Sequence, residues 1–402
     1  MAVGESSLEH HSVPGVRLAS LACGIKADKT NDLVMFEFEK GSTTAGVFTK
    51  SLFAAAPVEL GKKHLAKTSP EYFLINSGNA NAGVGDVGLD DASACCLAVS
   101  QLAGVHPEAV IPFSTGVIGE RLPVENVTNA LDRLIAELSE DNWLLAAEGI
   151  MTTDTRPKIT SRQISIDSKC ITLTGIAKGS GMIQPNMATM LSYIATDAVI
   201  ETTTLQSLLN EAVDASFNRI TVDSDTSTND SCMLTATGVS GLVIEADSSA
   251  ATSFLEALTS LCKELAHGII RDAEGATKFI SVRVKGGSTQ RECLEVAYSV
   301  ANSPLMKTAL FASDANWGRI VMAIGKADVD IDVKKLDVFL GDVRLMTQGN
   351  KDPHYSEAIG AEIFVKQEID IVININAGDF DETVWTSDLS HEYVRINAEY
   401  RT

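Results

Sequence analysis

The sequence predicts an α+β fold of layered sheets with flanking helices. Two observations support this class. Short apolar or alternating runs separated by turn residues fill the N-terminal third and return in the C-terminal quarter, a pattern typical of sheets. Between them, several segments repeat apolar residues at helical intervals. With 402 residues and 45% hydrophobic content, the chain can bury a large core and is long enough for two or three domains or one large layered unit.

Most elements of the first half follow from these patterns. Segment 158–177 alternates polar and apolar residues around Asp167 and Ser168, which predicts a hairpin. Val127, Leu131 and Leu134 lie on one face of segment 124–138, which predicts a helix. The other predicted elements are strands at 16–22, 33–39, 45–49 and 72–76, an apolar run at 109–113, and helices at 90–102 and 143–150.

The second half continues the alternation of helix and strand. A strand at 189–196 follows a glycine-rich loop, and amphipathic helices at 204–217 and 250–269 lie on either side of a strand at 232–236. The remaining sequence is rich in predicted strands, at 279–284, 329–340, 361–365, 368–375 and 393–396.

Charge limits the classes of partner. The chain has 32 Lys and Arg against 53 Asp and Glu, a net charge of −21, which argues against nucleic acid and anionic membranes and favours small molecules. The opening residues MAVGESSLEHHSVPG contain no apolar stretch of the kind found in secretory signals. No segment has the apolar length of a membrane span. We therefore expect a cytoplasmic protein.

Cysteines and acidic residues do not indicate a metal. The seven cysteines are scattered without a C-x-x-C pair, and we expect buried free thiols. The acidic turn at 223–230 lacks the glycine and the distal glutamate of a calcium loop. The segment Gly83-Val84-Gly85-Asp86-Val87-Gly88 matches G-x-G-x-x-G, but its first glycine comes too late after the strand for a dinucleotide site. The sequence predicts neither a metal nor a nucleotide cofactor.

The loop KGSGMIQPNMATML at 178–191 has the features of a self-cleavage site. Its glycines loosen the backbone, and the small Ala188 leaves the following peptide bond accessible. Cleavage between Ala188 and Thr189 would place Thr189 at the start of a strand with a free α-amine. That amine has a reference pKa of roughly 7.7 to 8.0 and can serve as the general base for the threonine hydroxyl. The alternative is an ordinary glycine-rich turn before a core strand.

Other polar residues are candidates for the same site. Thr115 and Gly116 follow an apolar run, where a bend would present backbone N–H groups as an oxyanion hole, or would be a plain turn. Lys178 is the first residue of the loop, and a cation beside a nucleophile can bind a substrate carboxylate, although most lysines are solvated. Thr152 lies in a polar MTTDT cluster, and Glu274, by itself, has the character of a surface carboxylate.

Several motifs along the whole chain resemble one family. The loop at 178–191 is similar to the autoprocessing site of the ornithine acetyltransferases of arginine biosynthesis, the ArgJ family of glutamate N-acetyltransferases. Further similar motifs occur in family order: NSGNANAG at 76–83, STGVIGE at 114–120, MTTDT at 151–155, DAEGATKF at 272–279, DANWGRI at 314–320 and INAEYRT at 396–402.

The resemblance implies a fold, a processing event and an assembly. The fold is the N-terminal-nucleophile-like autoprocessing arrangement of DmpA and ArgJ proteins. Self-cleavage yields an alpha chain of residues 1–188 and a beta chain of residues 189–402, and two copies of each form a heterotetramer. The reaction moves acetyl from N2-acetylornithine to glutamate through an acetyl-threonine enzyme, without a cofactor. Some members also use acetyl-CoA as a co-substrate, and the sequence leaves open whether this chain does.

The resemblance also assigns roles to single residues. Thr189 is the nucleophile, and Thr115 and Gly116 form the oxyanion hole. The substrate-binding residues it implies are Thr152, Lys178, Thr189, Glu274, Asn397 and Thr402. An ornithine side chain is cationic, so an anionic Glu274 is a chemically sensible partner.

Two alternatives from other classes stay open at this point. A self-processing aminopeptidase or amidase would use the same threonine with water as the acceptor, and would release acetate without transferring it. A non-enzymatic binding protein would keep the loop uncut and run as one full-length chain on a denaturing gel.

Overall fold

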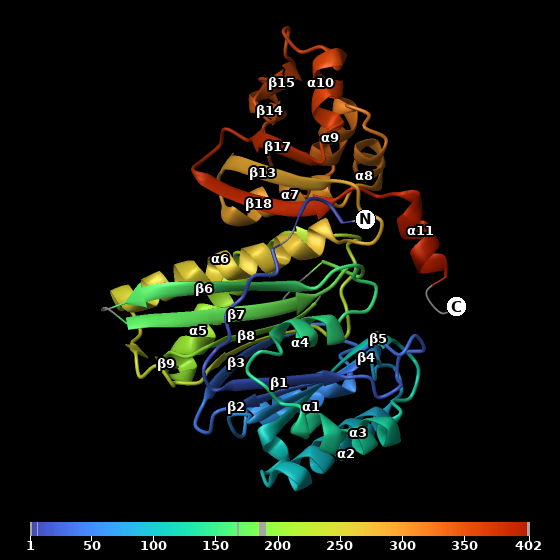
Figure 1. Cartoon of the computed structure of the whole chain (residues 1–402). Coiled ribbons are helices and arrows are strands. Elements are labelled where there is room, and N and C mark those ends of the chain that lie inside the picture. Colours follow the sequence, from blue (N-terminus) through green and yellow to red (C-terminus); the bar gives the residue numbers. More distant parts are fainter. Residues whose placement is uncertain (1, 6, 167–168, 185–189, 400–402) are drawn as a thin grey trace. The chain divides into compact units, whose positions relative to one another are not determined.

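The computed structural model describes residues 2–5, 7–166, 169–184 and 190–399. The chain divides into two compact units. The sandwich unit comprises Ser6–Asn218 and Thr226–Ile269, and the single-sheet unit comprises Met1–Glu5, Arg219–Asp225 and Ile270–Thr402. Each unit combines sheet and helix (Figure 1), so the predicted α+β class with layered sheets is confirmed.

Two main sheets form the centre of the sandwich unit. The first has the order β1-β2-β4-β5 and the second the order β3-β11-β8-β7-β6. A small sheet pairs β12 with β9. The strands are β1 (Val16–Leu21), β2 (Leu33–Phe38), β3 (Thr43–Phe48), β4 (Tyr72–Asn79), β5 (Val110–Val117), β6 (Lys158–Ile166), β7 (Lys169–Lys178), β8 (Leu191–Thr196), β9 (Val199–Ile200), β11 (Ser231–Ala236) and β12 (Val243–Ile244).

The two sheets pack on each other through an aromatic core. Successive side chains of a strand point to opposite faces, so Phe36 of β2 faces the second sheet while its neighbour Met35 faces the helices. The Phe36 ring lies 5.3 Å from that of Tyr193 on β8, and Phe113 on β5 lies 5.1 Å from the same ring. These contacts bury the inner faces of both sheets.

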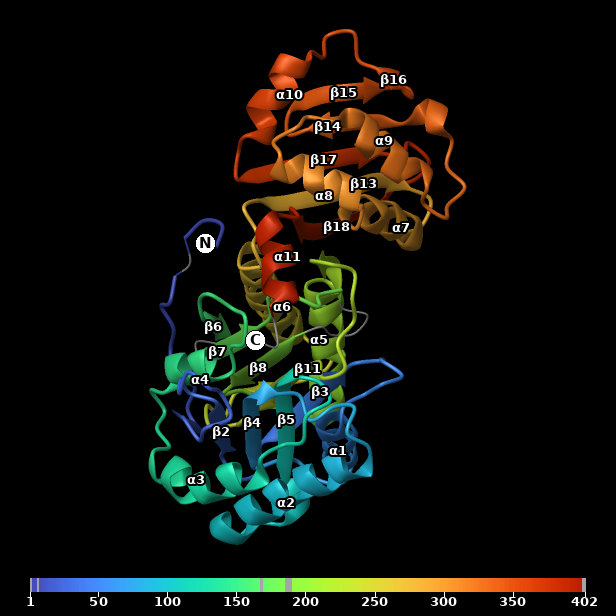
Figure 2. The same ribbon diagram turned by 90° about the vertical axis from the view of Figure 1, so that its right-hand side faces the viewer.

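Helices cover both outer faces of the sandwich. One layer packs on the first sheet through residues such as Cys96 and Leu131, and α6 packs on the second sheet, where Leu261 lies 2.9 Å from the Cβ position of Gly175. The result is a helix–sheet–sheet–helix arrangement, visible in Figures 1 and 2. The helices are α1 (Ala56–Leu65), α2 (Asp86–Ala103), α3 (Val124–Ala136), α4 (Trp143–Gly149), α5 (Thr202–Asp214) and α6 (Ser249–Arg271), with 3₁₀ turns at Pro107–Ala109 and Phe217–Arg219.

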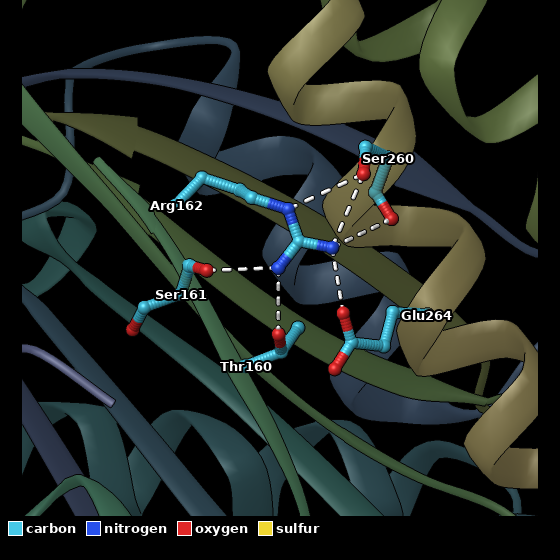
Figure 3. A network of polar contacts seen from close by, with 5 residues as sticks. All are labelled: Thr160, Ser161, Arg162, Ser260 and Glu264. Carbon is cyan, nitrogen blue, oxygen red and sulfur yellow. Dashed lines mark hydrogen bonds and ion pairs between the residues drawn. The ribbon is translucent and has the colours of Figure 1, made fainter. Parts of the chain in front are cut away.

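A polar network ties α6 to β6, an edge strand of the second sheet (Figure 3). The Arg162 guanidinium donates to the Glu264 carboxylate at 2.6 Å and to the Ser260 hydroxyl at 3.1 Å, both on α6. It also donates to the Thr160 hydroxyl at 3.0 Å. Exposed edge strands invite pairing with other chains, and covering them is one common protection.

The single-sheet unit is a seven-stranded mixed sheet with the order β10-β18-β13-β17-β14-β15-β16. Its apolar face, including Ile280, Val282 and Val284 of β13, packs against α7 and α9. The strands are β10 (Ile220–Thr221), β13 (Phe279–Gly287), β14 (Asp337–Leu340), β15 (Val343–Thr347), β16 (Asn350–Lys351), β17 (Glu368–Asn374) and β18 (Phe380–Ser387). The helices are α7 (Gln290–Ala301), α8 (Pro304–Phe311), α9 (Trp317–Gly325), α10 (Glu357–Phe364) and α11 (His391–Ala398), with a 3₁₀ turn at Val333–Lys335.

Two strand predictions in this unit are wrong, and a third is right only in part. Segment 361–365 lies in and just after α10, and segment 393–396 lies within α11. The serine before each helix accepts a hydrogen bond from the backbone N–H three residues later: Ser356 from Ile359, and Ser390 from Tyr393. Such N-terminal caps stabilise helices. Of the predicted strand 329–340, only the part from Asp337 is a strand.

Two sequence expectations concern the chain as a whole. No helix in the described part of the chain is long and apolar enough to span a membrane. All seven cysteines are free thiols. Five are buried as expected, whereas Cys170 is exposed and Cys23 is half-buried.

Candidate active site

The predicted oxyanion-hole residues lie at the end of a buried strand. β5 runs parallel to β4, with Gly116 opposite Gly78. A Cβ atom on Gly116 would lie 2.3 Å from the Gly78 carbonyl carbon, and the residue has φ +136°, so only glycine fits this close approach. The strand continues to Val117, which corrects the bend predicted at 114–116. The pairing register shifts at Asn79, an irregularity that strands often show next to functional sites.

Lys178 joins two other predicted site residues. It is the last residue of β7, and its side chain is buried. Its ammonium donates to the Thr152 hydroxyl at 2.8 Å and to the Thr115 hydroxyl at 3.2 Å. The sequence separations are 26 and 63 residues, so the fold brings together three residues that the sequence analysis singled out separately. A buried cation among hydroxyls is suited to binding a carboxylate.

Asp154 holds this cluster in place, and the sequence analysis missed it. Its carboxylate accepts the Lys158 ammonium, the Gly179 N–H at 2.8 Å and the Thr152 N–H at 3.0 Å. Burial alone would raise its pKa, but Lys158 and Lys178 hold that pKa well below the ordinary value of an aspartate. Asp154 is therefore ionised at neutral pH and fixes the backbone on the C-terminal side of Lys178. The polar MTTDT cluster was the available signal.

The strand after the glycine-rich loop begins beside Lys178. β7 and β8 are antiparallel, and Lys178 pairs with Leu191. Leu191 follows Thr189 by two residues in the sequence. Ala188 and Thr189, the predicted cleavage site and nucleophile, lie outside the described residues, as does the predicted substrate residue Thr402.

In the single-sheet unit, two predicted substrate residues meet. Glu274 lies in the connection between α6 and β13, and its side chain is buried. The Asn397 amide on α11 donates to its carboxylate at 2.6 Å. Gly275, with φ +68°, lets α11 approach closely, because a Cβ there would lie 2.5 Å from the Ser390 hydroxyl. The helix that replaces the predicted strand is thus what carries Asn397 to Glu274.

Asp388 fixes the same connection and was not found from sequence. Its carboxylate accepts the Thr277 N–H at 2.8 Å, the Thr277 hydroxyl at 2.6 Å and the Lys278 N–H at 2.9 Å. These bonds join the end of β18 to the residues after Glu274, more than a hundred positions earlier in the chain. No local sequence pattern indicates a contact over such a separation. The Tyr393 hydroxyl on α11 also donates to Asp223, at 3.1 Å.

Together, the fold and these residues define an α+β protein with two polar centres, one in each unit. The cationic centre of the sandwich unit suits carboxylates, and the anionic centre of the single-sheet unit suits cations. The chain belongs to the ArgJ family, whose model matches residues 17–402, and the family predicted from the sequence motifs is confirmed.

Named relatives agree with this assignment. The chain is 53% identical to the arginine biosynthesis bifunctional protein ArgJ of Pseudomonas syringae pv. tomato over 406 aligned positions, covering all of both chains. It is similar to the crystal structure of the protein of the same name from Bacillus halodurans, at 36% identity and a TM-score of 0.49 over 51% of this chain and 96% of that one. It is also similar to an ornithine acetyltransferase from Mycobacterium tuberculosis crystallised with ornithine, at 31% identity and a TM-score of 0.39 over 44% of this chain and 94% of that one.

Proposed function

We propose that this chain is the ornithine acetyltransferase of arginine biosynthesis, moving acetyl from N2-acetylornithine to glutamate. The observation that carries the proposal is the cluster of Lys178, Thr115 and Thr152 in a chain 53% identical along its whole length to a bifunctional ArgJ protein. Both substrates carry an α-carboxylate, which the buried ammonium of Lys178 would bind with Thr152 beside it.

The reaction runs in two half-reactions. The α-amine of Thr189, freed by cleavage after Ala188, takes the proton of the Thr189 hydroxyl, which attacks the acetyl carbonyl. Charge grows on the carbonyl oxygen, and donors at Thr115 and Gly116 stabilise it. The amide C–N bond then breaks, the released α-amine of ornithine takes a proton, and acetyl remains on Thr189. The α-amine of glutamate then attacks this ester and gives up a proton to the Thr189 α-amine. The ester C–O bond breaks, the Thr189 oxygen takes that proton, and N-acetylglutamate leaves the regenerated enzyme.

The anionic centre reads the donor's side chain. Glu274, oriented by Asn397, pairs with the δ-ammonium of ornithine, and the family resemblance adds Thr402 as a further substrate contact. A charge-assisted hydrogen bond of this kind is roughly twice as strong as a neutral one, so it selects acetylornithine over acetylated amino acids with neutral side chains.

Intact mass and product analysis test the proposal. Freshly purified protein should show chains of residues 1–188 and 189–402 under denaturing conditions, without added protease. With N2-acetylornithine and labelled glutamate it should form ornithine and labelled N-acetylglutamate in equal amounts. A single uncut chain would overturn the nucleophile assignment. Acetate release without labelled N-acetylglutamate would instead support the aminopeptidase or amidase alternative.

A second acetyl donor is part of the proposal. The word bifunctional in the names of relatives such as the Pseudomonas syringae protein supports acetyl-CoA as a co-substrate, because a thioester can acetylate the same threonine. Glutamate-dependent release of CoA, absent from a Thr189→Ala variant, is the expected result. Absence of this release from the wild type would leave a monofunctional transferase.

The assembly and compartment complete the proposal. We expect two alpha and two beta chains in one heterotetramer, formed in the cytoplasm. Native mass spectrometry should show a complex of four chains, with two of each kind. A single alpha–beta pair at working concentration would contradict the heterotetramer without affecting the proposed chemistry.

A further inference from the structure

Glutamate raises a binding problem that the residues named so far do not solve. It carries two carboxylates, whereas acetylornithine carries one carboxylate and an ammonium. Lys178 accounts for the carboxylate common to both. Glu274, the other charged residue that the proposed function assigns to a substrate, is an anion and is no partner for a second carboxylate. The proposed transfer therefore needs a second cation for its acceptor.

We infer that Lys26 is this cation, a substrate-binding residue of the sandwich unit that reads the side-chain carboxylate of glutamate. The inference rests on the proposed function and names a specificity-determining residue within it. Three observations support it: the place of the Lys26 side chain, the rigidity of its loop, and the charges around it.

The Lys26 side chain lies against the glycine that borders the predicted oxyanion hole. A Cβ on Gly78 would lie 3.1 Å from Lys26 Cγ and 3.6 Å from its backbone nitrogen. Gly78 in turn contacts Gly116, whose own Cβ position is 2.3 Å from the Gly78 carbonyl carbon. The neighbouring Thr115 accepts the Lys178 ammonium at 3.2 Å. A continuous set of contacts therefore joins Lys26 to the centre that contains Lys178, and the space that a side chain at residue 78 would need is filled by Ile25 and Lys26.

The loop between β1 and β2 that carries Lys26 is held by a buried carboxylate. Asp32 is fully buried, and it accepts four successive backbone N–H groups, those of residues 23 to 26, at 2.6, 3.1, 2.6 and 2.9 Å. Charge-assisted bonds of this kind are strong. A residue whose backbone is fixed in this way can present its side chain to a ligand with little ordering cost.

Lys26 keeps donor capacity for a ligand. Its side chain is half-buried, and its ammonium donates to the Asn31 carbonyl at 2.9 Å. An ammonium has three donors, and the described contacts of Lys26 use one of them. Burial lowers the pKa of Lys26, and the Lys178 charge adds to this lowering. The carboxylates of Asp28, Asp32 and Asp154 counteract it. Two cations that affect each other are stabilised together by a dicarboxylate, which is what glutamate supplies.

The test separates the two half-reactions in the processed enzyme. Lys26→Gln and Lys26→Met remove the charge, Lys26→Arg keeps it, and Lys29→Gln is the matched control, an exposed lysine in the same loop. The KM for glutamate should rise roughly 10- to 100-fold in Lys26→Gln and Lys26→Met, the range for hydrogen bonds to charged groups. Ornithine release in a single turnover on acetylornithine should stay within about threefold of wild type. Lys26→Arg should restore most of the glutamate KM, and Lys29→Gln should behave as wild type.

Glutamine as the acceptor distinguishes binding from a structural role. The preference of the wild type for glutamate over glutamine should fall in Lys26→Gln by about the same factor as the rise in glutamate KM. Equal losses on both acceptors, or equal losses in both half-reactions, would mean that Lys26 supports the loop, and the inference would be wrong. If the wild type transfers acetyl to glutamate, an unchanged glutamate KM in Lys26→Gln would also overturn the inference. A wild type that transfers no acetyl to glutamate would refute the proposed function itself.

Discussion

The sandwich unit and the single-sheet unit present their site residues in different settings. In the sandwich unit, Thr115 and Lys178 lie at the ends of buried strands, and Asp154 fixes the backbone beside them. In the single-sheet unit, Glu274 lies in a connection and Asn397 on a short helix without buried residues. Groups that stabilise developing charge need fixed geometry, whereas loops on a rigid scaffold commonly read the substrate. We therefore expect variants of Glu274 and Asn397 to change the use of acetylornithine while self-cleavage at Thr189 survives.

The largest effect should come from the nucleophile. Thr189→Ala removes the hydroxyl that both cleavage and transfer need, so both activities should fall by at least roughly three orders of magnitude. Stability should change little, because few atoms are lost. Intact mass and a transfer assay measure the two losses, with Thr202→Ala, an exposed threonine on α5, as the control. Transfer by a pure, uncut variant would contradict the assignment.

The next largest effect tests the rigid setting. Asp154→Asn leaves the buried Lys158 ammonium without its carboxylate, and breaking a buried pair in this way costs about 3–5 kcal/mol of unfolding free energy. Acetyl transfer should fall as well, because the Gly179 N–H loses its charged acceptor. Denaturant unfolding measures the cost. The control is Asp132→Asn, an exposed aspartate on α3, expected to change stability by less than about 0.5 kcal/mol.

The unfolding free energy lost in Asp154→Asn should depend on pH in a defined direction. The folded-state pKa of Asp154 lies below its unfolded value of about 3.9. Its stabilising contribution is therefore fully present above the unfolded pKa and declines as pH falls from there towards the folded pKa. The stability gap between wild type and Asp154→Asn should be constant from pH 7 to about pH 5 and should narrow below about pH 4. A gap that stayed constant down to about pH 3 would show that folding does not lower the pKa of Asp154, and a gap that widened as pH fell would show that folding raises it.

Three residues of the cationic centre could be singled out from the sequence because they lie in distinctive local strings. STG, MTTDT and KGSG each place a polar residue beside glycines or a strand end, and the fold brings Thr115, Thr152 and Lys178 together. Asp154 and Asp388 were missed for a physical reason. Their roles depend on partners brought close only by the fold: Gly179 is 25 residues from Asp154, and Thr277 is 111 residues from Asp388.

The fold errors have a different cause. Segments 361–365 and 393–396 are short apolar or alternating runs, and such runs do not distinguish strand from helix by periodicity. The deciding signal lay just before them, in the capping serines Ser356 and Ser390. A search for caps before assigning strands would have found α10 and α11. It would also have found α8, where Ser303 caps a helix that begins at Pro304.

A smaller effect tests the reading of the substrate. Glu274→Gln keeps size and hydrogen bonding but removes the charge, so kcat/KM for acetylornithine should fall by about 1.5–3 kcal/mol in transition-state stabilisation. Self-cleavage should survive, since that step involves no ornithine. With N-acetylnorleucine, a substrate of similar length whose side chain is neutral, the kcat/KM of the variant should fall little or rise. The control is Glu362→Gln, an exposed glutamate on α10. Equal losses on both substrates would mean that Glu274 supports the fold instead.

The smallest effect decides how Asn397 acts. Its amide donates to the Glu274 carboxylate at 2.6 Å and to the Tyr393 carbonyl at 3.0 Å, so Asn397→Ala removes an orienting bond while the Glu274 charge remains. We expect a loss of about 1 kcal/mol, roughly fivefold, in kcat/KM for acetylornithine. The control is Val394→Ala, at an exposed position on the same helix, which should leave kcat/KM for acetylornithine unchanged.

The double variant of Glu274→Gln and Asn397→Ala separates two roles. If Asn397 acts by orienting Glu274, the fall in kcat/KM caused by Asn397→Ala should nearly disappear in the Glu274→Gln background. The coupling energy between the two changes would then be about 0.5–1 kcal/mol. If Asn397 instead binds substrate directly, as the family resemblance implies, the two losses should add. Additive losses would mean that the 2.6 Å bond does not act through Glu274 in substrate binding, and that Asn397 contacts the substrate independently of Glu274.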